Sequence, residues 1–128
     1  MTVRVLIFDL DQTLADEGVV YQGLDEVLQQ LLQQGHRLFM CSYNPYADWF
    51  AKRQGIAEYF EEIIVNLEQD KGSTILELVS KLDVPLEQVL FFDDDETNVS
   101  DARQRGVSTY HVPIGGLTPT QVWQQIKQ

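Results

Sequence analysis

The chain has 128 residues, 9 of them basic and 20 acidic, so its formal charge is −11. A hydrophobic content of 44% predicts a globular protein and excludes a disordered one. The negative charge argues against nucleic acid as a partner, because phosphate backbones bind basic surfaces. No stretch has the roughly 18 apolar residues that a membrane span needs, so we expect no membrane partner.

The first third of the chain predicts a strand, a small hairpin and a helix. Residues 3–8 form a short apolar run, which is typical of a buried strand. The segments 13–15 and 19–21 flank the turn sequence DEG and predict a hairpin. Leucine and valine recur at helical spacing over 24–32, and Gly35 is expected to end that helix.

The middle of the chain predicts two strands and two helices. The strands are 37–41 and 62–65, and the helices lie at 44–54 and around 75–82. Asn44 has the character of an N-cap and Pro45 that of a first helical residue. Lys71 falls in the loop that follows the second of these strands. Trp49 and Phe50 have the spacing of core residues on the first helix.

The last third repeats the alternation of strand and helix. The predicted strands are 89–92 and 108–112, with a helix at 96–105 between them. The sequence TPTQ at 118–121 combines a cap, a proline at the first helical position and a capping-box glutamine, and so predicts a final helix.

This alternation predicts an α/β fold with a parallel sheet between helices. We expect a single three-layer Rossmann-like domain over residues 1–128, with five parallel strands in the order 3-2-1-4-5. Ligands bind beyond the carboxyl ends of the strands in such sheets. Polar residues from four segments follow strand ends here: Asp9, Asp11, Ser42, Lys71, Asp93, Asp94 and Asp95.

Carboxylates gathered at one edge repel each other, and a hard divalent cation such as Mg²⁺ resolves that repulsion. Magnesium in turn binds phosphate oxygens. Ser42 and Lys71 are suited to contact the remaining oxygens of a phosphoryl group. One carboxylate can attack phosphorus, and a second can serve as general acid and base. The pattern therefore predicts magnesium-dependent phosphate chemistry.

The same residues resemble the motifs of the haloacid dehalogenase superfamily of phosphohydrolases. The first motif, Asp-x-Asp-x-Thr after a hydrophobic strand, is present as FDLDQT. A serine closes the second strand in LFMCS, an isolated lysine follows as Lys71, and an acidic pair begins FFDDDETNVSDA. All four occur in the family's order. The serine and the FFDD…N ending are most similar to the magnesium-dependent phosphatase group of the superfamily.

The resemblance implies a role for each matching residue. Asp9 would be the nucleophile and Asp11 the general acid/base. The implied magnesium ligands are Asp9, Asp94 and the backbone carbonyl of Asp11. Ser42 and Lys71 would bind the phosphoryl group, and Tyr43 is a further candidate beside them. The supporting residues around the metal would be Asp93, Asn98 and Thr13.

The spacing leaves no room for an inserted cap domain, which many members of this superfamily carry. Only 31 positions separate Asp11 from Ser42, and 22 separate Lys71 from Asp93. The chain therefore resembles the capless branch. An open site of this kind is expected to accept a phosphorylated small molecule or a phosphoprotein.

Two other functions remain open on the sequence: a receiver-like signalling module that forms a phosphoaspartate, and a non-catalytic phosphate-binding module. The predicted third strand ends in Val65 and Asn66 rather than in an aspartate, which counts against a receiver. Cys41 lacks an arginine-bearing phosphate loop and is expected to be a small buried side chain. His36 and His111 are expected to be structural or on the surface. As Cys41 is the single cysteine, no intrachain disulfide is possible, and we expect a cytoplasmic monomer or weak dimer.

Overall fold

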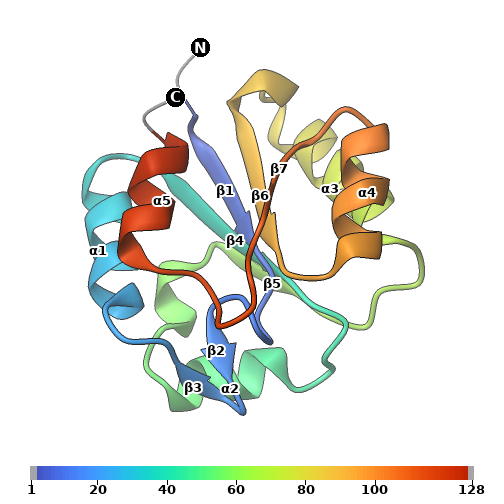
Figure 1. The fold of residues 1–128 in the computed structure, drawn as a ribbon. Helices are drawn as coiled ribbons and strands as arrows, with labels where there is room; N and C mark the ends of the chain where they lie inside the picture. The colour runs from blue at the N-terminus through green and yellow to red at the C-terminus, as the bar shows by residue number, and fades with distance from the viewer. Residues whose placement is uncertain (1–2, 127–128) are drawn as a thin grey trace.

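The computed structural model describes residues 3–126 and contains a five-stranded parallel sheet (Figure 1). Its strands are β1 (Val5–Phe8), β4 (Arg37–Cys41), β5 (Glu62–Ile64), β6 (Val89–Asp93) and β7 (Ser108–His111). Their order in the sheet is β5-β4-β1-β6-β7. Numbered along the chain, this is the predicted order 3-2-1-4-5, so the fold class and the strand order are confirmed.

Alternating side chains of β1 divide the core into two layers. Leu6 and Phe8 pack on one face of the sheet, and Val5 and Ile7 pack on the other. All four are fully buried, as expected for the central strand of a parallel sheet.

Helices cover both faces of the sheet (Figure 1). The helices are α1 (Leu24–Gln33), α2 (Ala47–Arg53), α3 (Lys71–Leu82), α4 (Glu96–Gln104) and α5 (Pro119–Ile126), with 3₁₀ turns η1 (Ala57–Tyr59) and η2 (Leu86–Gln88). Buried residues of α1, α2 and α5 share the layer of Leu6 and Phe8. Those of α3 and α4 share the layer of Val5 and Ile7.

A two-stranded hairpin lies between β1 and α1, as predicted. Its strands are β2 (Ala15–Asp16) and β3 (Val19–Val20). Gly18 has a φ of 80°, and the ring of Phe50 on α2 lies so close that a Cβ at Gly18 would be 2.7 Å from it. The backbone N–H of Val20 donates to Gln54 Oε1 at 3.1 Å. The hairpin is therefore attached to α2.

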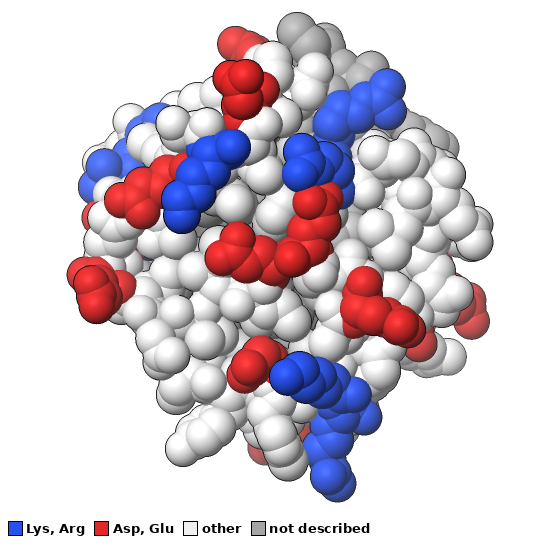
Figure 2. All heavy atoms as spheres, turned by 180° about the vertical axis from the view of Figure 1, so that it is seen from behind, with Lys and Arg blue, Asp and Glu red and all other residues white. Residues whose placement is uncertain are grey.

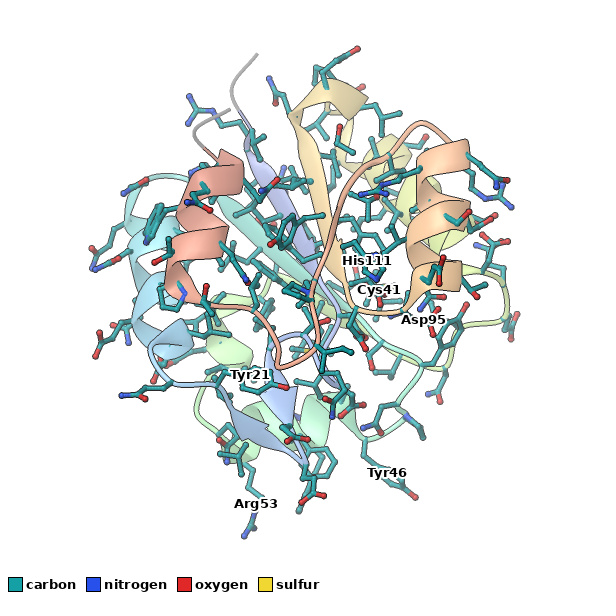
Figure 3. All side chains as sticks on the ribbon, in the orientation of Figure 1. Tyr21, Cys41, Tyr46, Arg53, Asp95 and His111 are labelled. Carbon is teal, nitrogen blue, oxygen red and sulfur yellow. The ribbon has the colours of Figure 1, made fainter. Side chains whose placement is uncertain are left out.

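The start of α2 differs from the prediction. The helix begins at Ala47 rather than at Pro45, because the Asn44 side chain accepts a hydrogen bond from the N–H of Tyr46 at 2.9 Å and forms a turn. The short helix buries Ala47 and Ala51. Trp49 is 50% exposed, so its predicted place in the core is wrong, whereas Phe50 packs partly buried against the core. Figure 3 shows Tyr46, also at this end of α2, pointing away from the molecule.

The last helix begins as predicted. The N–H of Thr118 donates to Gln121 Oε1 at 3.0 Å, and the N–H of Gln121 donates to Thr118 Oγ at 3.2 Å. These two bonds form the reciprocal capping box.

Charged side chains are mixed over the face of the molecule that lies behind the view of Figure 1. On that face, basic side chains lie in separate groups, several of them beside acidic ones (Figure 2). Among residues 3–126, no helix has both the length and the apolar character of a membrane span.

Candidate active site

A buried lysine joins two aspartates at the carboxyl edge of the sheet. Lys71 Nζ lies 2.8 Å from Asp9 Oδ1 and 2.8 Å from Asp93 Oδ2. The side chains are 2%, 9% and 0% exposed, respectively. We call these three residues the floor of the site.

The floor is assembled by three different elements. Asp9 follows β1, and its N–H donates to the carbonyl of Phe92 on β6 at 3.0 Å. Asp93 is the last residue of β6. Lys71, predicted in a loop, is the first residue of α3, and Asp70 caps that helix by accepting from the N–H of Ser73 at 2.7 Å. The cap fixes the point from which the Lys71 side chain enters the site.

Close packing of α3 against α4 also holds Lys71 in place. The N–H of Gly72 donates to Asp101 Oδ2 at 3.3 Å. A Cβ at position 72 would lie 2.6 Å from that oxygen and 2.6 Å from Cδ of Arg105. Arg105 in turn pairs with Asp70 at 3.0 Å and with Asp101 at 3.2 Å. Glycine at 72 therefore permits the approach of the two helices.

Burial and charge shift the titration of the floor. Burial raises the pKa of the Asp9 carboxyl to about 7, and the positive charge of Lys71 opposes that shift. Burial likewise raises the pKa of Asp93, again opposed by Lys71. For Lys71, burial favours the neutral form, but the charges and hydrogen bonds of the two aspartates outweigh it and raise the pKa of the ammonium group above its usual range. The lysine is therefore charged.

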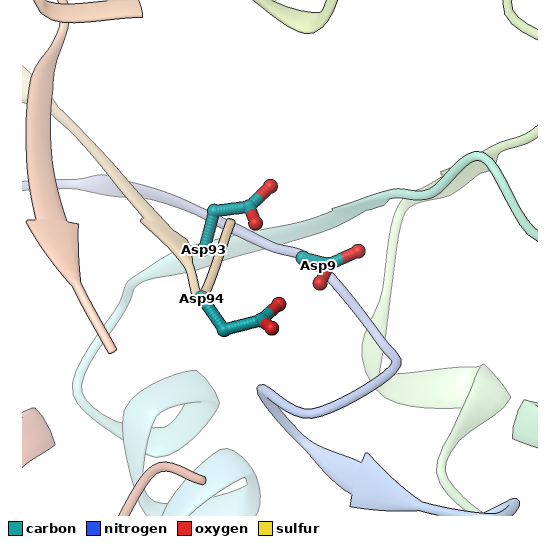
Figure 4. A group of neighbouring side chains, drawn as sticks. All are labelled: Asp9, Asp93 and Asp94. Atoms are coloured by element: carbon teal, nitrogen blue, oxygen red, sulfur yellow. The ribbon is translucent and has the colours of Figure 1, made fainter. Parts of the chain in front are cut away.

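Asp94 places a third carboxylate beside Asp9 and Asp93 of the floor (Figure 4). Carboxylate oxygens of Asp9, Asp93 and Asp94 lie within 4.8 Å of one another. The buried Thr13 links two of them, with Oγ 3.2 Å from Asp9 Oδ2 and 3.4 Å from Asp94 Oδ1. One ammonium group against three carboxylates leaves two negative charges, and an all-oxygen donor set with that charge fits a hard divalent cation such as Mg²⁺.

The oxygens of Asp93 already have partners within the protein. Oδ2 accepts from Lys71 and from Asn98 Nδ2 at 3.3 Å, and Oδ1 accepts from the N–H of Asp95 at 2.9 Å. Asp95 itself caps α4 by accepting from the N–H of Asn98 at 3.0 Å. Asp93 and Asn98 are thus hydrogen-bonded to each other beside the cleft, and Asp95 has the helix-capping role.

The remaining predicted residues surround the floor. Asp11 and Ser42 line the same small cleft of about 250 Å³ as Asp9 and Lys71. The chain turns just after Asp11, where Gln12 has a φ of 64°. This turn lets both aspartates of the first motif face one cleft. Tyr43 is half exposed, and its ring centroid lies 5.4 Å from Lys71 Nζ.

Asn44 is a site residue that the sequence analysis missed. Its Nδ2 donates to Asp11 Oδ2 at 3.0 Å, and its N–H donates to Ser42 Oγ at 3.1 Å. It therefore connects the partly buried Asp11 to the buried Ser42. Its position two residues after the serine motif was the available signal, but its polar side chain suggested a helix cap instead. We call Asp11, Gln12, Tyr43 and Asn44 the rim of the site.

The single cysteine and the two histidines do not line the cleft. Cys41 is fully buried at the end of β4, and burial raises the pKa of its thiol to about 12, so it is not suited to act as a nucleophile. His36 is buried away from the cleft-lining residues, and burial lowers the pKa of its imidazole. His111 is on the surface, as predicted, and its Nε2 is 3.0 Å from the carbonyl oxygen of Asp94.

The sequence matches the model of the haloacid dehalogenase-like hydrolase family over residues 8–106. No curated protein matches it. The structure is similar to the core domain of a Streptococcus pneumoniae protein described as a phosphoglycolate phosphatase, with a TM-score of 0.75 and 19% identity over 100% of this chain and 98% of that one. An L-2-haloacid dehalogenase, RSc1362, gives a TM-score of 0.82 at 13% identity over 100% of both chains.

A third solved structure was determined with magnesium. It is the N-terminal part of a Bacteroides fragilis protein that contains a phosphatase domain, with a TM-score of 0.69 and 18% identity. The alignment covers 88% of this chain and 36% of that one. At these identities the three likenesses concern the fold.

Proposed function

The chain belongs to the haloacid dehalogenase-like hydrolases, and we propose that it is a magnesium-dependent phosphomonoesterase that works through an aspartyl phosphate on Asp9. The proposed substrate is a phosphorylated small molecule or a phosphoprotein. The observation that carries the proposal is the buried Lys71, which lies 2.8 Å from both Asp9 and Asp93. A fixed positive charge beside a carboxylate at a strand end is suited to bind a phosphoryl group against a nucleophile.

The proposed metal ligands are Asp9, Asp94 and the main-chain carbonyl of Asp11. Magnesium bound there supplies positive charge that offsets the negative charge of the phosphoryl oxygens. Asp93, whose oxygens are taken up by Lys71, Asn98 and the N–H of Asp95, holds the floor in shape.

In the first step, an oxygen of Asp9 attacks phosphorus, and the bond from phosphorus to the leaving oxygen breaks. Lys71 holds the other oxygen of Asp9 through a 2.8 Å contact, which orients the attacking carboxylate. Ser42 Oγ accepts from the N–H of Asn44, so its hydroxyl hydrogen is free to donate to a phosphoryl oxygen. Asp11, in its acid form, donates a proton to the leaving oxygen.

In the second step, Asp11 acts in its carboxylate form. It takes a proton from a water molecule, whose oxygen attacks phosphorus and displaces Asp9. Inorganic phosphate and the free Asp9 carboxylate result. The hydrogen bond from Asn44 to Asp11 holds Asp11 where it can serve both steps.

Dehalogenation is the second function to consider, because a similar fold is found in an L-2-haloacid dehalogenase. The three converging carboxylates favour phosphate chemistry. A cation-dependent site suits a phosphate dianion, whereas displacement of a halide by one carboxylate has no need of two more beside it. A receiver-like module is disfavoured because Asp9, the proposed phosphorylated residue, follows β1 rather than the third strand of the sheet.

The test is hydrolysis of 4-nitrophenyl phosphate with magnesium, with excess chelator, and with chelator followed by added magnesium. We expect activity that vanishes with chelator and returns with the metal. Rapid acid quenching and peptide mass spectrometry should locate a phosphoryl group on Asp9. Full activity in chelator, or an adduct on Asp11, would contradict the proposal. Chloride release from 2-chloropropionate without phosphatase activity would support the dehalogenase alternative.

A further inference from the structure

A second hollow opens beside the proposed phosphoryl site. It has a volume of about 520 Å³, larger than the cleft of about 250 Å³ that holds the floor. Gln12 and Asp94 line both, so the two adjoin. We call it the side hollow; its wall also includes Glu96, His111, Pro113 and Ile114.

The wall of the side hollow is fixed to the site on two sides. His111 Nε2 lies 3.0 Å from the carbonyl oxygen of Asp94 and, facing an acceptor, carries the proton. The segment that joins β7 to α5 runs beside β2 (Figure 1), and the N–H of Leu117 on it donates to the carbonyl of Thr13 at 3.0 Å. The hollow therefore keeps a defined position relative to Asp9.

The charged side chains around the two hollows are nearly all acidic. Asp94 and Glu96 line the side hollow, and five aspartates line the cleft. Of the described residues that line either one, Lys71 is the only lysine or arginine, and it is paired with Asp9 and Asp93. Arg103 borders an adjoining groove, where its guanidinium donates to the carbonyl of Thr109 at 3.0 Å.

We infer that the alcohol part of the substrate binds in the side hollow, and that it is neutral or positively charged rather than a carboxylate or a second phosphate. The inference rests on the proposed phosphatase activity and names the class of ester that this site prefers. With Asp94 bound to the metal, a second anion would still meet Glu96, and none of the described residues of the wall is a lysine or arginine that could bind it. An ammonium group would be attracted to Glu96. Pro113 and the fully exposed Ile114 offer apolar contact to the carbon skeleton.

The test uses three aryl phosphates of one shape. They are phenyl phosphates with a 4-aminomethyl, a 4-hydroxymethyl or a 4-carboxymethyl group, assayed with magnesium at pH 8. The methylene group keeps the acidity of the leaving phenol similar, so differences in kcat/KM report the remote charge. We expect the carboxymethyl ester to have a kcat/KM at least about fivefold below that of the hydroxymethyl ester, as a single unit charge near another implies. The difference should shrink in high salt.

Two variants locate the effect. Glu96→Lys reverses a charge on the wall, and Ile114→Lys adds one at a fully exposed position where folding is not disturbed. Each should raise the relative kcat/KM of the carboxymethyl ester about fivefold or more. Glu87→Lys, an exposed residue of η2 at the opposite end of β6, makes the same change in net charge as Glu96→Lys and should leave the ratio unchanged.

Each outcome is decisive. If no ester is hydrolysed, the proposed phosphatase function is wrong. If all are hydrolysed and the wild-type protein prefers the carboxymethyl ester, or treats the three alike, the inference is overturned while the function stands. It is also overturned if Glu96→Lys and Ile114→Lys change the ratio no more than Glu87→Lys does.

Discussion

The floor and the rim of the site are built in opposite ways. The floor places its charges in a dry environment: Lys71, Asp9 and Asp93 are at most 9% exposed, and Lys71 contacts each aspartate at 2.8 Å. The rim is wet: Tyr43 is 50% exposed, Gln12 is exposed, and Asp11 is only partly buried. Its contact from Asn44 to Asp11 is a single hydrogen bond of 3.0 Å.

This difference in burial suits the floor and the rim to two different tasks in the proposed reaction. Buried charges are costly unless they are paired, so the floor can hold only one arrangement, which suits the fixed geometry of phosphoryl transfer. Exposed residues cost little to rearrange, so the rim suits the leaving group, which varies from substrate to substrate. Changes on the floor should therefore alter stability and chemistry together, and changes on the rim should alter activity alone.

The largest effect should come from the two aspartates of the first motif. Asp9→Asn removes the proposed nucleophile, and phosphatase activity should fall to background. Asp11→Asn keeps the nucleophile but loses proton transfer, which is worth about 10²–10⁴ in rate. With an activated aryl phosphate, the Asp11 variant should accumulate phosphorylated protein, since it lacks the base for the second step. Intact-mass spectrometry distinguishes the two, and an adduct on the Asp9→Asn protein would contradict the assignment.

Lys71→Met should give the next largest effect, and it tests the floor itself. It leaves two buried carboxylates without their partner, a change that costs about 3–5 kcal/mol in buried pairs. The free energy of unfolding, measured by urea denaturation in the presence of chelator, should fall by about that amount. Phosphatase activity should be lost. Glu61→Gln is the control, because it breaks the Arg37–Glu61 pair, which is about 40% exposed, and should cost less than about 1 kcal/mol. Equal losses would remove the distinction between floor and surface.

Asn44→Ser tests the rim. Serine can still accept from the N–H of Tyr46, but it lacks the amide that donates to Asp11. We expect kcat to fall about tenfold through a misplaced acid/base, with an unfolding free energy within about 0.5 kcal/mol of wild type. A large loss of stability would mean that Asn44 acts mainly as a turn residue.

Changes at Cys41 should have the smallest effect, and its reactivity reports how far water reaches into the protein beside the floor. Since burial raises the pKa of its thiol to about 12, only about one molecule in 10⁴ carries the thiolate at pH 8. Iodoacetamide should leave the folded protein unmodified at that pH and modify it completely in urea. Cys41→Ala should keep the phosphatase activity. Rapid alkylation of the folded protein would show that water reaches the end of β4.

The fold was predictable because its signals are local and repeated. The three central strands, β4, β1 and β6, are mainly apolar runs with polar residues at their carboxyl ends, and parallel strands bring those ends to one edge. From that rule, the sequence alone predicts that Asp9, Ser42, Lys71 and Asp93 lie at one edge of the sheet. The contacts and burial of individual side chains did not follow from it, because they depend on neighbours that are distant in the sequence.

Two residues illustrate what the sequence could not specify. Asn44 is of a residue type that often caps helices. Only its hydrogen bond to Asp11, 33 positions away, shows that its side chain also belongs to the site. Trp49 has the spacing of a core residue, yet α2 is so short that it buries only its alanines, and the indole remains half exposed beside Arg53, whose guanidinium lies 5.2 Å from the ring centroid. In both cases tertiary contacts override a local preference.

The attachment of the hairpin to α2 has a consequence for the proton donor. The ring of Phe50 fills the space above Gly18 and Gln54 accepts from Val20, and α2 is itself anchored in the core through Ala47 and Ala51. Asp11 lies just before the hairpin and Asn44 just before α2. The same contacts that dock the hairpin therefore keep the two partners of the Asn44–Asp11 hydrogen bond side by side.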